Sequence, residues 1–359
     1  MTTSVCFDVQ HLYYLPQYLP VAHALNAAGV NVSFVVHRNN DLQSILEKVV
    51  KDENLNAHWV DGNDGAFKAF QQHPSDWIIF GNIPKFETEQ ATQLHAKLAL
   101  MQHGIGPKSC YYEVSKYPFD VRFVEGQRRL QRLQAMYPTH TFEDVGFAKL
   151  DPLFNQASST LSLTDLGLDP AKPTLLYAPT FYPSSLECFP ANWPKLLADY
   201  NLILKPHFFS LTKQNYKKQR RLLKCWASFS NVYLAKIDDY NLLPFMSLAD
   251  LMISDASSAI FEFITLDKPV IWCDFHKLRW TYRGPFRYRL KQRLDGDIEH
   301  FHQVTRRAAK SSDVLTLIKQ ELALPIALSD ARHQMAEHLA GKIDGQCSQR
   351  ICRYLLEHA

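Results

Sequence analysis

The chain has 359 residues, of which 46% are hydrophobic and 21% charged, and its net charge is +3. This composition supports large hydrophobic cores and excludes a disordered chain, and so small a net charge does not indicate nucleic-acid binding. The length predicts roughly two domains. No stretch approaches the ~20 apolar residues of a membrane span. The seven scattered cysteines form no Cys-x-x-Cys pair and no signal-peptide pattern is present, so we expect a reduced, cytoplasmic protein.

Short apolar segments alternate with amphipathic helical segments in the first half of the chain. Strands are predicted at 4–9, 31–37, 57–60, 77–80, 97–103, 121–126 and 142–146. Helices are predicted at 19–29 and 41–50. This alternation indicates a parallel sheet with helices on both faces.

A polar stretch at 155–173 then interrupts the pattern and is typical of a linker. The alternation restarts after it, with strands predicted at 174–180, 201–207, 231–236, 250–255 and 269–274. The last quarter of the chain is predicted to be mostly helical. We therefore predict an α/β protein of two doubly wound domains that face a central cleft, with the split near 150–172.

Ligands of open α/β sheets bind beyond the carboxyl ends of the strands. Several residues lie at or just after the ends of predicted strands and are therefore candidates for a site: Gln10, His11, His103, Gly104, Thr180, His207, Asp255, Ser257 and Ser258. The two serines precede an apolar helical run, and a serine there can cap the helix. The N–H groups and dipole of such a helix start can also bind a phosphate. An ordinary capped helix is the alternative.

Histidines at two strand ends are candidates for catalysis and for phosphate binding. His103 precedes two glycines within three residues, on an open turn where it can act as a general base. The alternative is a hydrogen-bonded histidine beside a tight turn. Lys205 and His207 form a cationic pair suited to a diphosphate, and the alternative for His207 is a surface loop residue after a proline turn.

Taken together, these segments resemble the CDP-glycerol glycerophosphotransferase family, the teichoic-acid primases and polymerases with the GT-B fold. The matching segments stand in the family's order and are HGIGPK (103–108), VGFAKLDPLF (145–154), LLYAPTF (175–181), LKPHFF (204–209), DLMISDASSAIFEF (250–263), DKPVIW (267–272) and IDGQCSQRI (343–351). The resemblance implies a Rossmann-like acceptor domain at 1–150. It implies a nucleotide-donor domain at 151–359, whose terminal helix packs back on the first domain.

The family transfers a polyol phosphate from a CDP-linked donor to an acceptor hydroxyl and releases CMP. The resemblance implies that His103 is the general base and that CDP-glycerol is the donor substrate, and it identifies no metal or cofactor. The donor-binding residues that it implies are Thr180, Lys205, His207, Asp255, Ser257, Ser258 and Glu262. We also predict acceptor binding by His11, Gly104 and Arg283. For Glu262 we favour a solvent-facing or structural carboxylate over a ribose or glycerol contact.

The stretch from Lys277 to Arg293 is dense in arginine and aromatic residues. It could contact an anionic glycan, a lipid diphosphate or a membrane surface, although a solvated basic loop is slightly favoured. We accordingly expect a cytoplasmic protein that works at the inner face of the membrane, with a glycan or lipid-linked acceptor and without nucleic acid.

Two other classes of function stay open from the sequence. One is a GT-B glycosyltransferase that uses a UDP- or CMP-sugar, since it needs the same phosphate site. The other is a non-catalytic protein that binds glycan precursors, which is weakened by the presence of His103, Lys205 and His207 together. A UDP-N-acetylglucosamine 2-epimerase is disfavoured because Ser257 and Ser258 stand where a Gly-Gly pair is expected.

Overall fold

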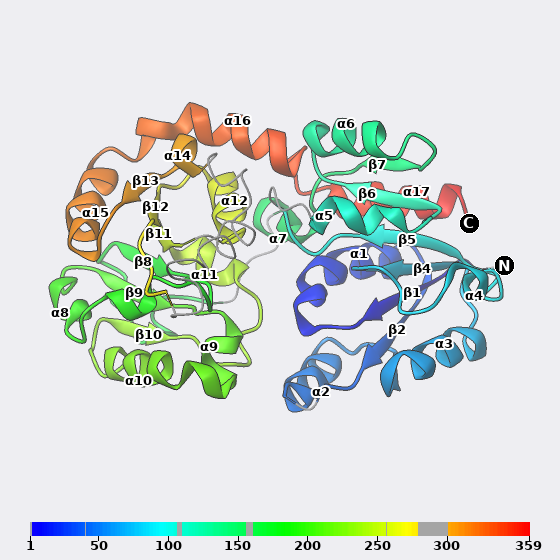
Figure 1. Ribbon diagram of the computed structural model, residues 1–359, viewed down its shortest axis with the longest axis horizontal. Coiled ribbons are helices and arrows are strands. Elements are labelled where there is room, and N and C mark those ends of the chain that lie inside the picture. Colours follow the sequence, from blue (N-terminus) through cyan, green and yellow to red (C-terminus); the bar gives the residue numbers. More distant parts are fainter. Residues whose placement is uncertain (1, 40, 106–109, 156–160, 256, 279–300) are drawn as a thin grey trace. The chain divides into compact units, whose positions relative to one another are not determined.

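The structure is a computed structural model that describes residues 2–39, 41–105, 110–155, 161–255, 257–278 and 301–359. The chain divides into two compact units: unit 1 comprises Met1–Ala157 and Glu337–Ala359, and unit 2 comprises Ser158–Ala336. Each unit is built on one parallel sheet with helices beside it (Figure 1). No helix in the described ranges is both long and apolar enough to span a bilayer.

Unit 1 contains a seven-stranded parallel sheet in the order β3-β2-β1-β4-β5-β6-β7. Its strands are β1 (Ser4–Val9), β2 (Asn31–His37), β3 (Ala57–Val60), β4 (Trp77–Phe80), β5 (Lys97–Met101), β6 (Val121–Val124) and β7 (Phe142–Asp144). The direction of strand addition reverses between β1 and β4. The carboxyl ends of these two strands therefore flank the switch point at which ligands of open sheets bind.

The helices of unit 1 begin with α1, which starts four residues earlier than predicted because Pro16 fits the first turn. They are α1 (Leu15–Ala27), α2 (Gln43–Asp52), α3 (Gly62–Gln72), α4 (Thr88–Ala91), α5 (Cys110–Glu113), α6 (Gln127–Met136), α7 (Asp151–Phe154) and α17 (Cys347–Glu357). Helix α16 (Ser329–Ala340) contains the boundary between the two units.

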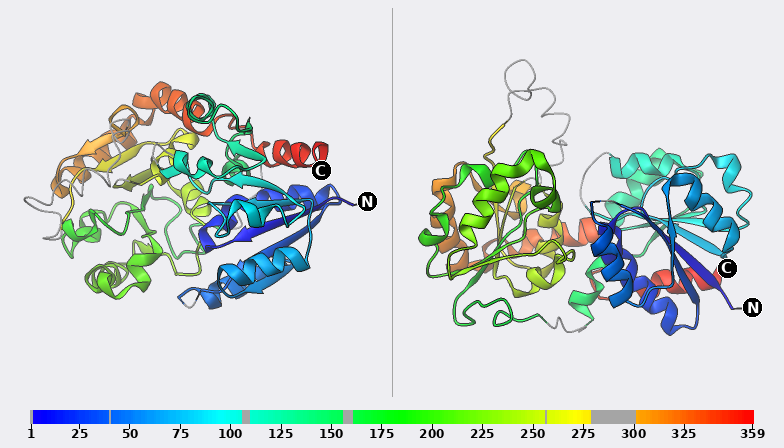
Figure 2. Two further views of the ribbon diagram at one scale, coloured as in Figure 1. Left: turned by 45° about the vertical axis from the view of Figure 1, so that its right-hand side comes forward. Right: turned by 90° about the horizontal axis from the view of Figure 1, so that it is seen from below.

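The terminal helix α17 packs on the first unit, beside α1 (Figures 1 and 2). The buried Asp151 carboxylate accepts hydrogen bonds from the Cys347 N–H at 3.1 Å and the Ser348 N–H at 2.6 Å, so it caps the helix start. At the other end the Trp77 indole N–H donates to the Leu355 carbonyl at 3.1 Å. Hydrogen bonds therefore join two segments that lie about 200 residues apart in the sequence, 145–154 and 343–351.

Unit 2 contains a six-stranded parallel sheet in the order β10-β9-β8-β11-β12-β13. Its strands are β8 (Thr174–Tyr177), β9 (Asn201–Leu204), β10 (Val232–Leu234), β11 (Leu251–Ser254), β12 (Val270–Cys273) and β13 (Arg306–Ala308). Its other helices are α8 (Trp193–Leu196), α9 (Phe208–Thr212), α10 (Lys217–Trp226), α11 (Leu243–Leu248), α12 (Ala259–Phe263), α14 (Phe301–Val304) and α15 (Val314–Ala323). The switch point of this sheet lies between β8 and β11.

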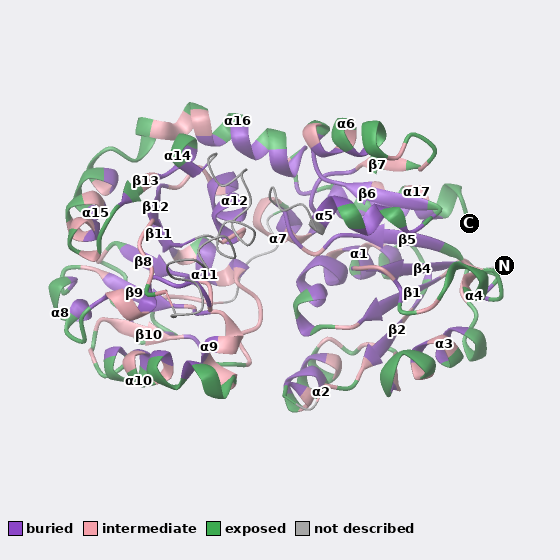
Figure 3. Cartoon of the chain, in the orientation of Figure 1, coloured by how far each residue is buried: buried purple, intermediate pink, exposed green. Residues whose placement is uncertain are grey.

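The strands of both sheets are mostly buried, whereas the outer faces of the helices are exposed (Figure 3). In unit 2 the core beside β8 is aromatic: the Phe189 and Trp193 rings stack at 4.0 Å, and Trp193 packs on Trp226 at 5.1 Å. Aromatic rings of this size bury large apolar areas, so they fix helices α8 and α10 against the sheet.

One strand was not predicted from the sequence. Strand β13 pairs in parallel with β12 at the sheet edge, with Ile271 opposite Arg306 and Cys273 opposite Ala308. It has three residues, two of them arginines, so it carries neither apolar alternation nor β-branched enrichment. A short, charged edge strand is favoured in natural sheets because it discourages pairing with other chains.

Candidate functional site

Asp255 lies at the switch point of unit 2, directly after β11, and is fully buried. Its Oδ1 accepts a hydrogen bond from the Thr180 N–H at 2.6 Å, and its Oδ2 accepts from the Ser185 N–H at 2.9 Å. The Ser184 and Ser185 hydroxyls also donate to Oδ2, at 3.2 and 3.1 Å. Burial raises the pKa of Asp255 to about 6, although these four hydrogen bonds partly oppose the shift.

The structure gives Asp255 a role in positioning a loop, and its predicted donor-binding role stays a prediction. Both carboxylate oxygens are used inside the unit, where they hold the loop that follows β8. Asp255 positions Thr180 and is itself fully buried. The sequence pattern placed this residue at the correct strand end, but a strand end is also where a buried carboxylate can organise the neighbouring loop.

The serines after Asp255 begin a helix that is shorter than predicted. Helix α12 has five residues and continues only as a 3₁₀ turn, Ile264–Leu266. The Ala259 N–H donates to the Ser257 hydroxyl at 3.3 Å, whereas Ser258 occupies the N-cap position without a side-chain capping bond. Ser257 thus does the capping that was expected of both serines.

His207 occupies the N-cap position of α9, after strand β9. Its Nδ1 accepts a hydrogen bond from the Phe209 N–H at 3.2 Å, and its backbone N–H donates to the Pro179 carbonyl at 3.3 Å. A neutral imidazole that accepts at Nδ1 carries its proton at Nε2, where it can donate to an anion. The ring also packs on Phe208 and Phe181, at 4.6 and 4.7 Å.

Unit 2 therefore brings the predicted donor-side residues to the carboxyl ends of three adjacent strands. Thr180 follows β8, Lys205 and His207 follow β9, and the two serines follow β11. Glu262 is 3% exposed within α12, so it is not the solvent-facing carboxylate that was one of its favoured alternatives. The ends of these strands thus carry hydroxyl, imidazole and ammonium side chains, which are kinds of group that bind phosphates.

In unit 1, His103 follows β5 and lies among tyrosine rings. Its ring stacks on Tyr14 at 4.9 Å and packs on Tyr13 at 4.8 Å. Its Nδ1 lies 3.5 Å from the Gly81 carbonyl and 3.4 Å from the Gln102 side-chain nitrogen. When Nδ1 donates to Gly81, Nε2 keeps the lone pair that a general base requires.

Two glycines leave room for the tyrosine rings that surround His103. A Cβ on Gly104 would lie 2.8 Å from the Tyr111 hydroxyl, and a Cβ on Gly81 would lie 2.8 Å from the Tyr14 ring. Both contacts are closer than real Cβ atoms tolerate, so the rings around His103 need glycine at these positions. For Gly104 this steric role is the one the structure gives, beside its predicted role in acceptor binding.

His11 follows β1 and is exposed on one side. Its ring stacks on Tyr13 at 5.0 Å with an interplanar angle of 10°, and packs edge-on against Tyr14 at 5.5 Å. Partial burial lowers the pKa of His11, and the positive potential of His37 and Lys85 lowers it further. Tyr13 was missed in the sequence, although it lies close after a predicted strand end and its side chain is 39% exposed.

A buried polar group was also missed. The Asp8 carboxylate, 2% exposed, contacts the His37 Nε2 at 2.7 Å and accepts from the Gln10 side-chain N–H at 2.7 Å. Asp8 belongs to β1 and His37 ends β2, so the paired carboxyl ends of neighbouring strands bring them together. Strand pairing was the signal that could have found this group, since both segments had been predicted as strands.

Some predicted residues lie outside the described ranges. Arg283 and most of the basic stretch that begins at Lys277 fall within 279–300, and residues 106–108 of the HGIGPK segment fall within 106–109. Among the residues that the structure describes, no group of three histidine, cysteine or acidic side chains is arranged to hold a metal ion.

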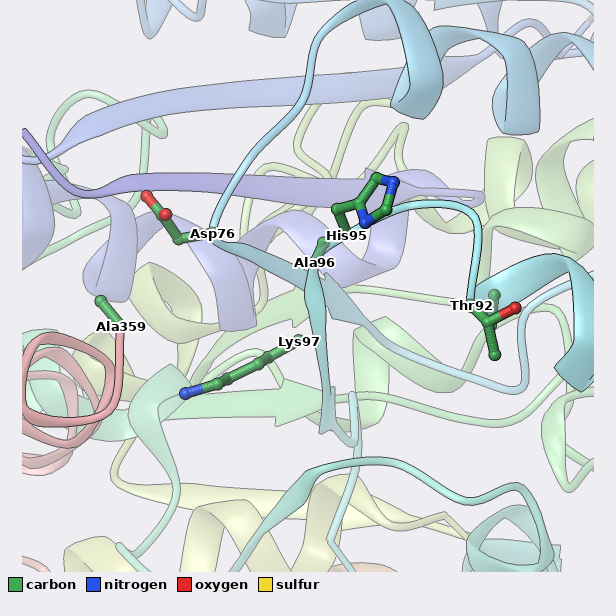
Figure 4. A pocket seen from close by; sticks show the side chains of 7 residues that line it. Asp76, Thr92, His95, Ala96, Lys97 and Ala359 are labelled. Carbon is green, nitrogen blue, oxygen red and sulfur yellow. The ribbon is translucent and has the colours of Figure 1, made fainter.

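A pocket of about 320 Å³ lies at the amino ends of β4 and β5 in unit 1 (Figure 4). Asp76 and Lys97 line it, but the Asp76 carboxylate accepts from the Ser4 N–H and hydroxyl at 2.7 and 2.8 Å, and the Lys97 ammonium donates to the His358 carbonyl. Asp76 thereby joins the starts of β4 and β1, and Lys97 joins the start of β5 to the C-terminal end of the chain. The pocket is at the wrong end of the sheet for an α/β ligand site.

Two doubly wound units with polar residues at their switch points define an α/β protein of GT-B type. The sequence matches the family described as CDP-Glycerol:Poly(glycerophosphate) glycerophosphotransferase over residues 108–357, and the chain therefore belongs to that family. It is a CDP-glycerol glycerophosphotransferase-like transferase, as predicted. The predicted family is likewise confirmed, as is the prediction of two parallel-sheet α/β units of GT-B type. His103 lies just before the matched span.

Solved structures similar to this chain have the same fold at low identity. The wall teichoic acid polymerase TagF matches with a TM-score of 0.68 and 14% identity, over 99% of this chain and 88% of that one. A putative UDP-N-acetylglucosamine 2-epimerase from Listeria monocytogenes has a TM-score of 0.65 and 12% identity, over 100% and 96%. The S. aureus MnaA–UDP structure has a TM-score of 0.62 and 14% identity, over 100% of this chain and 98% of that one. No curated protein matched the sequence.

Proposed function

We propose that this protein transfers glycerol phosphate from CDP-glycerol to a hydroxyl group of a cell-surface glycan or lipid-linked acceptor, and releases CMP. Membership of the family supports this proposal, as does the similarity to TagF, of which a variant was soaked with CDPG. The observation that carries it is the convergence of Thr180, Lys205, His207 and Ser257 at the carboxyl ends of β8, β9 and β11. We place this activity in the cytoplasm, at the inner face of the membrane.

On the donor side, phosphoryl transfer requires positioning and charge stabilisation more than covalent chemistry. His207 would donate from Nε2 to a diphosphate oxygen, and Lys205 would supply positive charge. The Ser257 and Ser258 hydroxyls and the start of α12 would bind the remaining oxygens. Asp255 would act through Thr180, by holding the loop after β8 in place. Donors fixed before the reaction stabilise developing charge without reorganisation.

On the acceptor side, His103 would be the general base. Its Nε2 would take the proton of the acceptor hydroxyl while Nδ1 donates to the Gly81 carbonyl. The acceptor oxygen attacks the phosphorus that bears glycerol, and the bond from that phosphorus to the oxygen of CMP breaks. The electron pair of this bond leaves with CMP. The stacked rings of His11 and Tyr13 would give the acceptor an aromatic surface to lie on.

A binding experiment tests the donor. Thermal unfolding would be followed with CDP-glycerol, CDP-ribitol, UDP-sugars and CMP-sugars, because a ligand that binds only the folded state raises the apparent stability. We expect the largest upward shift with CDP-glycerol, and a smaller shift in the variant with Ser257→Ala and Ser258→Ala. The matched control replaces Ser228 and Ser230, which are exposed before β10 at the opposite end of the sheet. A larger shift with a UDP-sugar would instead support the glycosyltransferase alternative.

A further inference from the structure

A strongly basic surface lies next to the candidate donor site in unit 2. Residues 200–237 contain eight lysines and arginines and no aspartate or glutamate, although the whole chain has a net charge of only +3. The rest of the chain therefore carries a net negative charge. Helix α10 holds five of the eight cations and lies on the outside of unit 2, beside α9 and β10 (Figure 1).

The cations are gathered on one side of α10. Lys217, Arg221 and Lys224 are spaced at i, i+4 and i+7, so they share one helix face, and Lys218 lies beside them; we call these four exposed residues the basic stripe. The buried side of the helix consists of Gln219, Leu223 and Trp226. From the first to the last cation the stripe rises roughly 10 Å.

Helix stability does not account for this sequence. Lys217 and Lys218 stand in the first turn, where positive charge opposes the helix dipole and where α10 has no acidic residue. Like charges at i and i+4, as for Lys217 and Arg221, also destabilise a helix. Residues that break a local rule without a structural gain often mark a functional surface.

The stripe is connected to the donor site within unit 2. The Gln219 side-chain N–H, on the buried side of α10, donates to the Phe181 carbonyl at 3.1 Å. Phe181 follows Thr180, the residue that Asp255 holds, and its ring packs on His207. Helix α10 is thereby tied to the two loops that carry the donor-side residues.

We propose that the basic stripe binds the phosphodiester backbone of a poly(glycerol phosphate) acceptor, an inference that rests on the proposed function and takes this acceptor from the description of the family. A narrow row of exposed cations is complementary in charge to a linear chain of phosphates. Among the described residues, none of the exposed large hydrophobic side chains belongs to α10. Helices that lie in a membrane surface insert an apolar face, so the stripe is better suited to a dissolved polyanion.

The test measures binding of a fluorescently labelled poly(glycerol phosphate) oligomer to the whole protein, without CDP-glycerol. In nucleic acids, single-strand contacts release about 0.7 counterions per phosphate, so four contacts predict a roughly fifty-fold loss of affinity from about 50 to 200 mM salt. The variant with Lys217→Gln, Lys218→Gln, Arg221→Gln and Lys224→Gln should bind at least about ten-fold more weakly and lose most of the salt dependence. Glutamine has nearly the helix propensity of lysine and arginine.

The matched control has the same change in net charge. It replaces four exposed lysines on other surfaces by glutamine: Lys51, Lys68, Lys195 and Lys319. The proposal requires wild-type-like binding by this control. Equal binding by the stripe variant and the control would overturn it. The proposal would also be overturned if the stripe variant still bound the oligomer but no longer bound phosphatidylglycerol vesicles. The stripe would then be a membrane contact.

The two proposals fail in different ways. If the basic stripe does not bind the polymer, the four substitutions leave oligomer binding unaffected while CMP release from CDP-glycerol continues. If the donor chemistry is wrong, CMP release is absent in the wild type, and the binding assay, which contains no donor, still reports on the stripe.

Discussion

Thr180 donates its backbone N–H to the fully buried Asp255 carboxylate at 2.6 Å, across the two strands between which the sheet order of unit 2 reverses. Through this bond, the residue after β11 holds the loop after β8 in position. Two sides of the candidate donor site are therefore fixed by one fully buried carboxylate. A buried network in which the donors and the acceptor satisfy each other holds such a loop rigidly.

The ionisation of Asp255 should make stability fall as pH rises. Its pKa is raised from 3.8 in the unfolded chain to about 6 in the folded protein, so the folded state binds more protons between these values. Stability contributed by this group is present below about pH 4 and is lost up to about pH 6, at about 1.4 kcal/mol per pH unit. An asparagine side chain cannot titrate, so chemical denaturation of wild type and Asp255→Asn across this range isolates the effect.

The stability advantage of the wild type over Asp255→Asn should shrink by roughly 3 kcal/mol across that window. Above the window the variant should still bind CDP-glycerol more weakly, because one amide side chain cannot accept from every donor that holds the loop. If the stability difference between wild type and Asp255→Asn is constant or grows with pH, the hydrogen bonds, and not burial, determine the pKa of this carboxyl group.

Gly81→Ala should destabilise unit 1. The new Cβ would lie 2.8 Å from ring carbons of Tyr14 and 2.9 Å from the Tyr18 hydroxyl, and both of these tyrosines are fully buried. Overpacking of this kind costs about 1–3 kcal/mol. The control is Gly65→Ala in α3, whose Cβ meets Val60 at an ordinary 3.5 Å and should stabilise the helix by roughly 0.5–1 kcal/mol. Urea denaturation that gave both variants the same sign would refute the packing described around His103.

His207 should have two separable roles. His207→Asn keeps a side-chain acceptor for the Phe209 N–H, since asparagine is a good N-cap, but loses the Nε2 donor. It should fold with wild-type stability and bind CDP-glycerol at least about ten-fold more weakly. His207→Ala should lose the donor affinity and, in addition, about 1 kcal/mol of stability. Titration calorimetry showing full donor affinity in both variants would restrict His207 to capping.

Tyr13 should contribute to acceptor binding through its ring. Tyr13→Ala should raise the acceptor KM several-fold, by the ~0.5–1.5 kcal/mol typical of aromatic contacts, while donor affinity stays unchanged. Tyr13→Phe keeps the ring that stacks on His11 and should retain most of the activity. Steady-state kinetics in which Tyr13→Phe is as impaired as Tyr13→Ala would assign the effect to the hydroxyl.

The strand ends were predictable because strand and helix periodicities differ strongly in an α/β chain. They placed His103, Thr180, His207 and Ser257 at the carboxyl ends where the structure has them. What each side chain does there was not predictable from one position alone. Asp255 faces inward because donors from the neighbouring loop reach it, and that loop is separated from it by about 70 residues.

Long-range partners account for the other omissions. Asp8 and His37 meet only through the pairing of β1 with β2, and Asp151 caps a helix that starts nearly 200 residues later. Strand β13 lacks the apolar pattern of a buried strand because it lies at an edge. Each of these features depends on which segments become neighbours, which a local pattern does not contain.

The most direct test of the account is transfer by His103→Ala. With CDP-glycerol labelled in its glycerol phosphate and a hydroxyl acceptor, the wild type should form CMP and labelled acceptor in equal amounts. His103→Ala should lower turnover by about 10²–10⁴ and leave CDP-glycerol affinity unchanged, whereas the exposed control His23→Ala should behave as wild type. Wild-type turnover by His103→Ala, or CMP release without labelled acceptor in the wild type, would contradict the mechanism.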